Sequence, residues 1–232
     1  FSCLGEKEKL INDELNFKEV EKLGFDLQNG FINDDIKAIN LLYDKYSLAN
    51  RFLLKTSKKR VLEFNVGFYR GFARDFNFGE ILIAEKSKGT SYEFVKFYKD
   101  QDKNYHLLFR FFSINGINYH DHLIKKVKSI PKIVDTYMFM SGENLSETYK
   151  TIYKSALYGS NFLTKDLSKT RFVKDMTKLK KIKELNSLGK YEKSHKIYKT
   201  ISNTSKQEKV FKLINITIVS NLSLILYEEA LK

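Results

Sequence analysis

Two histidines, an aspartate and a tyrosine near the middle of the chain could together do acid–base chemistry. His120 and His122 alternate along one predicted strand, so both side chains point to the same face of a sheet. If the next hairpin loop centres on Lys128-Ser129, His122 faces Asp135 and His120 faces Tyr137. A His–Asp pair beside a second histidine and a tyrosine could act as a general base. These four residues are therefore the candidates for catalysis.

The same residues have two other interpretations. A His-x-His pair on a strand suits a zinc ion, but a zinc site usually takes three protein ligands, and spacing fixes no third one. Asp135 and His106 are the available guesses, and a register slip of one residue would put Asp135 on the opposite face. The third interpretation is that these are half-buried polar residues of a sheet. We predict neither a metal nor a cofactor.

A second group of polar residues could bind a ligand. Asn115-Gly116 is the strongest hairpin signal in the chain, and a two-residue turn there sets Arg110 opposite Asp121. This pair could orient an anionic ligand, or it could be a structural cross-strand ion pair. Tyr119, on the same strand as Asp121, and Glu143 complete the predicted ligand-binding set. Glu143 could instead cap the helix that follows, where the helix dipole favours an acid.

The elements that must position these residues follow from two periodicities. Period-two alternation predicts an antiparallel sheet of four strands, at 91–99, 104–114, 117–127 and 132–141. Spacing of three or four residues predicts helices before the sheet, at 17–30, 36–43, 47–54 and 58–86, and after it, at 144–158, 173–187, 190–201 and 206–231. The order indicates an α+β fold, with N-terminal helices packed on a curved antiparallel sheet of about four strands and an all-α helical-hairpin tail.

The longest of the early helices, over residues 58–86, is expected to cover the sheet. It carries a phenylalanine at every fourth position, which are Phe64, Phe68, Phe72 and Phe76. Gly67 and Gly71 lie inside it and would let another element approach closely. We expect this helix to lie across the inner side of a bent sheet and to roof a hollow.

The helix-then-hairpin order resembles the NTF2-like, or cystatin-like, α+β architecture, in which a curved sheet wraps a helix and leaves a conical pocket. Stretches of the chain also resemble an uncharacterised family of exported bacterial proteins. These stretches are Leu107-Leu108-Phe109-Arg110, Gly116-Ile117-Asn118-Tyr119-His120-Asp121, Ile133-Val134-Asp135-Thr136-Tyr137 and Ser141-Gly142-Glu143-Asn144-Leu145-Ser146. In that family tetratricopeptide-like helices follow the sheet domain, and the resemblance implies no activity.

The tail carries a shorter resemblance of its own. Gly189, Tyr191, Ser194, Tyr198 and Ile201 are similar to the second helix of a tetratricopeptide repeat, with Ser194 where alanine is usual. One repeat is legible, and repeats need about three units for independent stability. The resulting division is a tether at 1–16, an NTF2-like domain at 17–160 and a helical, tetratricopeptide-like region at 161–232.

The chain is strongly basic, with a formal net charge of +13. Lysine is abundant and arginine scarce, and base readout favours arginine, so nucleic acid is an unlikely partner. Part of the charge lies on the tail, where Lys174, Lys178 and Lys181 share one helical face. That face could meet an anionic partner, a lipid headgroup or nucleic acid, or it could be an ordinary solvated helix face.

The first residues resemble part of an export signal. Phe1-Ser2-Cys3 followed by polar residues looks like the end of a bacterial lipoprotein signal, in which the cysteine becomes the lipidated N-terminus. The alternative is an incidental thiol. We therefore expect an exported protein, periplasmic or membrane-anchored through Cys3, with a cytoplasmic location as the alternative.

Common catalytic motifs are absent, including G-x-x-x-x-G-K-[ST], G-x-G-x-x-G, G-x-S-x-G, H-E-x-x-H and C-x-x-C. The sequence thus favours a non-catalytic module that binds a small ligand or a protein. A pocket enzyme using His120 or His122 with Asp135 is the alternative. A basic tail that binds nucleic acid or anionic lipid is the second alternative.

Overall fold

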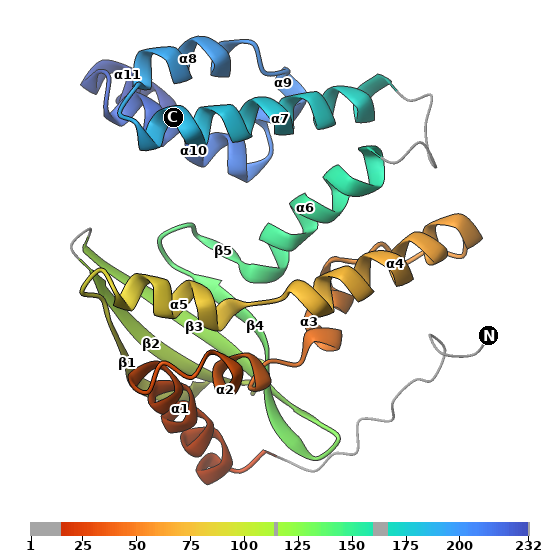
Figure 1. Cartoon of the computed structure of the whole chain (residues 1–232), viewed down its shortest axis with the longest axis vertical. Coiled ribbons are helices and arrows are strands. Elements are labelled where there is room, and N and C mark those ends of the chain that lie inside the picture. The colour runs from red at the N-terminus through yellow and green to blue at the C-terminus, as the bar shows by residue number, and fades with distance from the viewer. Residues whose placement is uncertain (1–14, 114–115, 160–166, 232) are drawn as a thin grey trace. The chain divides into compact units, whose positions relative to one another are not determined.

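The computed structural model describes residues 15–113, 116–159 and 167–231 (Figure 1). The chain divides into two compact units, Phe1–Lys150 and Thr151–Lys232, and each is described by itself. The fold is mixed α+β and 59% helical, with one open antiparallel sheet and helices both before and after it. The α+β class expected from the sequence is therefore confirmed.

The helices of the first unit begin at side chains that cap them. Asn16 and Glu19 form a reciprocal capping box at the start of α1, and Asp35 and Asp44 each accept a backbone N–H at the starts of α2 and α3. The first three helices are α1 (Phe17–Ile32), α2 (Ile36–Leu41) and α3 (Lys45–Phe52). Gly30 does not end α1, because the helix continues to Ile32.

The expected long helix at 58–86 is two helices, α4 (Lys59–Asp75) and α5 (Phe78–Lys86). Phe76 between them has an extended backbone, and the side-chain oxygen of Asn77 accepts the backbone N–H of Glu80 at 3.3 Å. An asparagine three residues before a glutamate is a helix N-cap signal, and here it outweighs the unbroken phenylalanine row.

The sheet is a meander of five strands in the order β1-β2-β3-β4-β5. The strands are β1 (Ser91–Lys99), β2 (Tyr105–Ser113), β3 (Gly116–Val127), β4 (Ile130–Met138) and β5 (Glu143–Asn144). The expectation of about four strands is corrected by β5, whose two residues pair with Tyr137 and Met138 of β4. So short a strand leaves no alternation to detect in the sequence.

The helix that covers the sheet is α1, and not the phenylalanine-rich helix (Figure 1). α1 packs on β1, β2 and β4, and α2 and α5 pack beside it. Gly24 of α1 allows the close approach, because a Cβ there would lie 2.8 Å from the ring of Phe94 on β1. The face of the sheet under α1 is called the inner face below.

The phenylalanines of α4 pack elsewhere. Phe72 lies 5.2 Å, between ring centroids, from Phe52 of α3 and 4.8 Å from Tyr149. Gly67 and Gly71 meet no described atom within 4 Å of a built Cβ, so the expected close approach does not occur at either glycine. Phe72 and Phe76 are buried and Phe64 and Phe68 are half-buried, so the row belongs to the core in part, and it does not roof the sheet.

The second unit is helical. It holds most of α6 (Leu145–Gly159), then α7 (Leu167–Ser187), α8 (Tyr191–Lys199), α9 (Asn203–Lys206), α10 (Lys209–Ser220) and α11 (Leu224–Leu231). The helix expected at 206–231 is thus interrupted at 207–208 and at 221–223. Among the described residues, none of these helices has the length and apolarity needed to cross a membrane.

The core of this unit is shared by three of its helices and the turn after α8. Its buried members are Phe172, Leu179, Ile182, Tyr198, Ile201, Phe211 and Ile218. α7 and α8 form a hairpin that turns at Gly189, whose φ of 66° favours glycine. The fully buried Ser194 lets α8 approach α7, and its hydroxyl donates to the carbonyl of Ile182 at 3.4 Å.

Candidate functional site

Both candidate histidines lie on β3 and point into the buried inner face. Nδ1 of His122 is 2.8 Å from the hydroxyl of Thr136 and 3.3 Å from that of Tyr43, and Nε2 is 2.7 Å from the hydroxyl of Tyr92. The Tyr92 hydroxyl also lies 3.2 Å from Nδ1 of His120. These five side chains form one connected hydrogen-bond network.

The network is closed on its far side as well. Nε2 of His120 lies 3.3 Å from the side-chain amide nitrogen of Asn118. Every ring nitrogen of the two histidines therefore has a partner within hydrogen-bond distance. Both histidines are buried, and the rings of Phe78, Phe109 and Phe111 surround them.

Burial decides the charge of both rings. Loss of water lowers the pKa of His120 to about 4, and the same loss, with the nearby His120 adding to it, lowers the pKa of His122 well below its ordinary value. Both imidazoles are therefore neutral at neutral pH. Neutral, fully bonded rings under a helix are the arrangement of structural core histidines.

Asp135 does not face His122, although the turn itself is where the sequence put it. Lys128 and Ser129 form the two-residue turn, both with positive φ, and Val127 pairs with Ile130. A register shift follows between Leu123 and Ile124, after which Thr136 faces His122 and Asp135 faces Leu123. The shift places one extra residue on β4, which turns Asp135 to the outer face. The predicted His122–Asp135 pair is therefore wrong.

The buried carboxylate of Asp135 holds the start of α6. It accepts the backbone N–H of Ser146 at 3.1 Å and the Ser146 hydroxyl at 2.5 Å, and Nη1 of Arg51 lies 3.6 Å away. An acid bonded to the first turn of a helix satisfies free N–H groups and suits the helix dipole. The role of Asp135 is structural.

Tyr137 also lies away from the histidines. The same shift pairs His120 with Met138 and sets Tyr137 opposite Asp121 on the outer face. There its ring lies 5.1 Å from that of Phe139, and Phe139 lies 6.1 Å from Tyr119. The four catalytic candidates thus separate into two faces of the sheet.

The Arg110–Asp121 pair is not formed either. Ser113 pairs with Gly116, so Arg110 faces Tyr119 and Asp121 faces Leu108. The shift is two residues along β3, so the side chains keep the predicted face but lose the predicted partner. Arg110 instead forms an ion pair with Glu93 of the neighbouring β1.

Asp121 belongs to a cluster that sequence reasoning missed. Its carboxylate lies 3.0 Å from Nδ1 of His106 and accepts the Tyr98 hydroxyl at 2.6 Å, while Nε2 of His106 lies 3.1 Å from Asp100. Partial burial by itself lowers the pKa of His106, but the two carboxylates outweigh it and the net pKa is raised. Alternation of His106 with buried apolar neighbours was the only available signal.

Glu143 lies in β5 and bonds to the helix that follows. Its side chain accepts the Thr148 hydroxyl at 2.7 Å, one turn into α6. Glu143 therefore contacts the first turn of α6, and its role at a pocket rim or as a helix cap stays a prediction.

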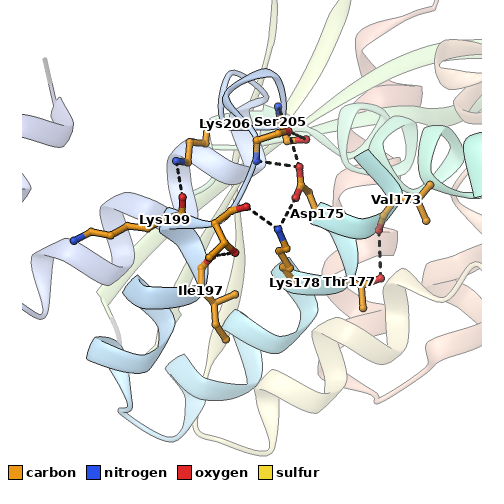
Figure 2. Close-up of polar contacts among 10 residues, drawn as sticks. Val173, Asp175, Thr177, Lys178, Ile197, Lys199, Ser205 and Lys206 are labelled. Atoms are coloured by element: carbon orange, nitrogen blue, oxygen red, sulfur yellow. Dashed lines mark hydrogen bonds and ion pairs between the residues drawn. The ribbon is translucent and has the colours of Figure 1, made fainter. Parts of the chain in front are cut away.

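The lysines of the tail lie on α7 as predicted, but they differ in what they contact. Figure 2 shows Lys178 of this set beside Asp175. Nζ of Lys178 donates to Asp175 at 3.2 Å and to the carbonyl of Thr200 at 2.7 Å. Lys181 lies 3.6 Å from Glu184, and Lys174 is exposed with no partner among the described residues. Lys174 is therefore the most available cation of the three.

The remaining predictions concern Cys3 and a metal site. Cys3 lies outside the described residues. Among the residues that are described, no three His, Cys, Asp or Glu side chains are arranged to hold a metal ion.

Comparison with known proteins assigns no family. The chain matches none of the protein-family models, and no curated protein is a significant match. The functional argument therefore rests on the residues themselves.

Proposed function

We propose that the protein is a non-catalytic binding module that uses the outer face of its sheet to bind another protein. The observation that carries the proposal is an exposed aromatic and aliphatic patch around Arg110. Across β2 and β3, Phe112 pairs with Ile117 and Arg110 pairs with Tyr119. Phe139 extends the patch beyond β4, and its backbone N–H donates to the carbonyl of Tyr119 at 3.0 Å.

The patch has the composition of a protein interface. Phe112, Ile117 and Phe139 are 52%, 57% and 54% exposed. Contiguous exposed apolar side chains mark interaction sites, and aromatic residues with arginine are enriched where proteins bind proteins. A pleated sheet face is broad and shallow, whereas a small ligand needs a concave site. This favours a protein partner over a small molecule.

The inner face supports a structural role for the histidines. A general base must reach a substrate proton, and His120 and His122 are buried with all four ring nitrogens paired. The polar network fixes the core beneath α1, which leaves the outer face as a rigid platform. No observation favours the acid–base alternative.

A selection experiment tests the binding surface. A displayed random-peptide library is selected against the purified chain, and the affinity of the enriched peptides is measured by calorimetry. Replacing Phe112 and Phe139 together by serine should weaken binding at least tenfold, because hot spots concentrate on such aromatic anchors. The matched control replaces Ile32 and Ile81, which are 55% and 59% exposed on helices of the same unit.

The outcome separates the possibilities. Peptides that bind the Ile32/Ile81 control variant normally but bind the Phe112/Phe139 variant weakly support the outer face as the binding surface. Circular dichroism must show that both variants are folded. Peptides that bind the aromatic variant unchanged, or whose NMR shift changes map to the helices, refute the proposal.

The finer assignments belong to the same proposal. The order of helices before a meander supports an NTF2-like, or cystatin-like, sheet unit, and the α7–α8 hairpin with its buried Ser194 supports tetratricopeptide-like packing. Phe1-Ser2-Cys3 supports export and lipidation at Cys3. Labelling of the full gene product with a fatty-acid analogue, compared with Cys3→Ser, tests the anchor.

A further inference from the structure

The second unit has a small basic pocket that no part of the proposed function uses. It lies between the N-terminal half of α7 and the turn that joins α8 to α9, and its volume is about 390 Å³. The residues that line it are Arg171, Lys174, Asp175, Lys178, Thr200 and Ser202. Figure 2 shows Asp175 and Lys178 side by side at this turn.

The carboxylate of Asp175, which lies in the pocket, is fully engaged in hydrogen bonds within the protein. Oδ1 of Asp175 accepts a hydrogen bond from Nζ of Lys178. Oδ2 accepts hydrogen bonds from the backbone N–H and the hydroxyl of Ser202, at 3.1 and 2.6 Å. Burial alone would raise the pKa of Asp175, but these bonds and one from Ser205 outweigh it, so the pKa is lowered. The carboxylate is ionised, buried and turned toward its partners, and it neutralises one cation.

Two cations remain available at the mouth of the pocket. Arg171 and Lys174 are exposed, and neither has an ion pair or hydrogen bond among the described residues. With Asp175 cancelling Lys178, the pocket retains two positive charges. Lys178 also donates to the Thr200 carbonyl at 2.7 Å, which holds its ammonium at the turn after α8.

We propose that this pocket binds a phosphate group. A guanidinium presents a planar fork of N–H donors that matches phosphate oxygens, and a lysine beside it adds a point charge. Two free positive charges match a phosphate monoester, which carries nearly two negative charges at neutral pH. The group could belong to a soluble metabolite or to a lipid headgroup, because both present the same chemistry.

A nucleic-acid backbone fits this site less well. Such a surface needs cations that follow many phosphates in succession. Along the same face of α7, Lys178 is bonded to Asp175 and Lys181 lies beside Glu184, so the unpaired cations of that face are Arg171 and Lys174 among the described residues. A compact ligand is the better match.

The test uses the full chain and two matched variants. Arg171→Gln with Lys174→Gln removes the two free pocket charges, and Lys180→Gln with Lys183→Gln removes two exposed charges elsewhere on α7. Binding of inorganic phosphate and glycerol phosphate is followed by NMR titration in chloride buffer. Vesicles of phosphatidylcholine with and without phosphatidic acid form the second arm, read by co-sedimentation.

We expect the pocket variant to weaken binding at least tenfold and the control variant to change it less than twofold. Binding of the soluble phosphates identifies a free ligand, and binding of phosphatidic acid vesicles alone identifies a headgroup; either result supports the pocket. Equal loss in both variants, no binding in either arm, or binding of duplex DNA that both variants reduce alike overturns it. Lys174→Gln alone replaces the double variant if circular dichroism shows that the latter is unfolded.

Discussion

Mild acid should destabilise the first unit through the two buried histidines. In the folded protein burial lowers the pKa of His120 to about 4 and that of His122 well below its ordinary value. In the unfolded chain both rings take up protons near their ordinary pKa of 6.5. The unfolded state therefore binds more protons below that pH, and the free energy of unfolding falls as the pH falls toward the folded pKa.

The size of the effect follows from the His120 pKa. Protonation of the unfolded chain at about pH 5 lowers the free energy of unfolding by about 2 kcal/mol for this residue, relative to its value above pH 7. His122 acts in the same direction over the same range. Carboxylates contribute mainly below this window, because the unfolded chain starts to protonate them near their own, lower pKa values.

The measurement is urea unfolding at several pH values between about 7.5 and 5, followed by tyrosine fluorescence. His120→Phe should flatten the pH dependence by about 1.4 kcal/mol per pH unit, because one proton no longer binds on unfolding. His106→Gln is the control. The pKa of His106 is raised in the folded protein, so its stabilising contribution is already complete below pH 6.5 and is lost only as the pH rises through the folded pKa.

Two results would refute this reasoning. Stability of the wild type that does not change between pH 7.5 and 5 would mean that the histidines are not buried in neutral form. A slope that His120→Phe leaves unchanged, while His106→Gln flattens it, would place the titrating ring on the outer face.

Two substitutions test the packing of the first unit. Gly24→Ala should destabilise it by about 1–3 kcal/mol, because the added Cβ would lie 2.8 Å from the ring of Phe94. Gly67→Ala has open space around the added Cβ and should stabilise the unit by up to about 1 kcal/mol. Thermal unfolding of both variants should show changes of opposite sign, and equal changes would contradict this prediction. Asp135→Asn should cost about 1–3 kcal/mol in urea unfolding, because the bonds to Ser146 at the start of α6 lose their charge; an unchanged midpoint would show that the buried carboxylate is dispensable.

Local signals in the sequence predicted where most elements begin and end. The predicted strand at 91–99 coincides with β1, and the Lys128-Ser129 turn joins β3 to β4 as expected. Strand alternation depends only on neighbouring residues, so it also assigned His120 and His122 correctly to one face. The capping aspartates of α2 and α3 act within a single turn, so such caps depend on neighbouring residues alone.

The cross-strand partners of the site residues depend on the strand register, which the alternation of side chains does not reveal. One extra residue on β4 between the turn and Asp135 separated the His122–Asp135 pair. The turn between β2 and β3 lies one residue earlier than predicted, which sets Arg110 opposite Tyr119, and the β1–β2 register sets it opposite Glu93. A bulge changes which residues face each other without changing either strand's composition.

The sequence alone determined the α+β class, the strand-forming segments and the basic face of α7, because each follows from residues close together in the chain. Only the tertiary structure decided that α1 covers the sheet, through the space left by Gly24 beside Phe94, and that Asp175 neutralises Lys178 while Arg171 and Lys174 stay free. Both decisions depend on contacts between distant segments, whose geometry is set by packing and not by local periodicity.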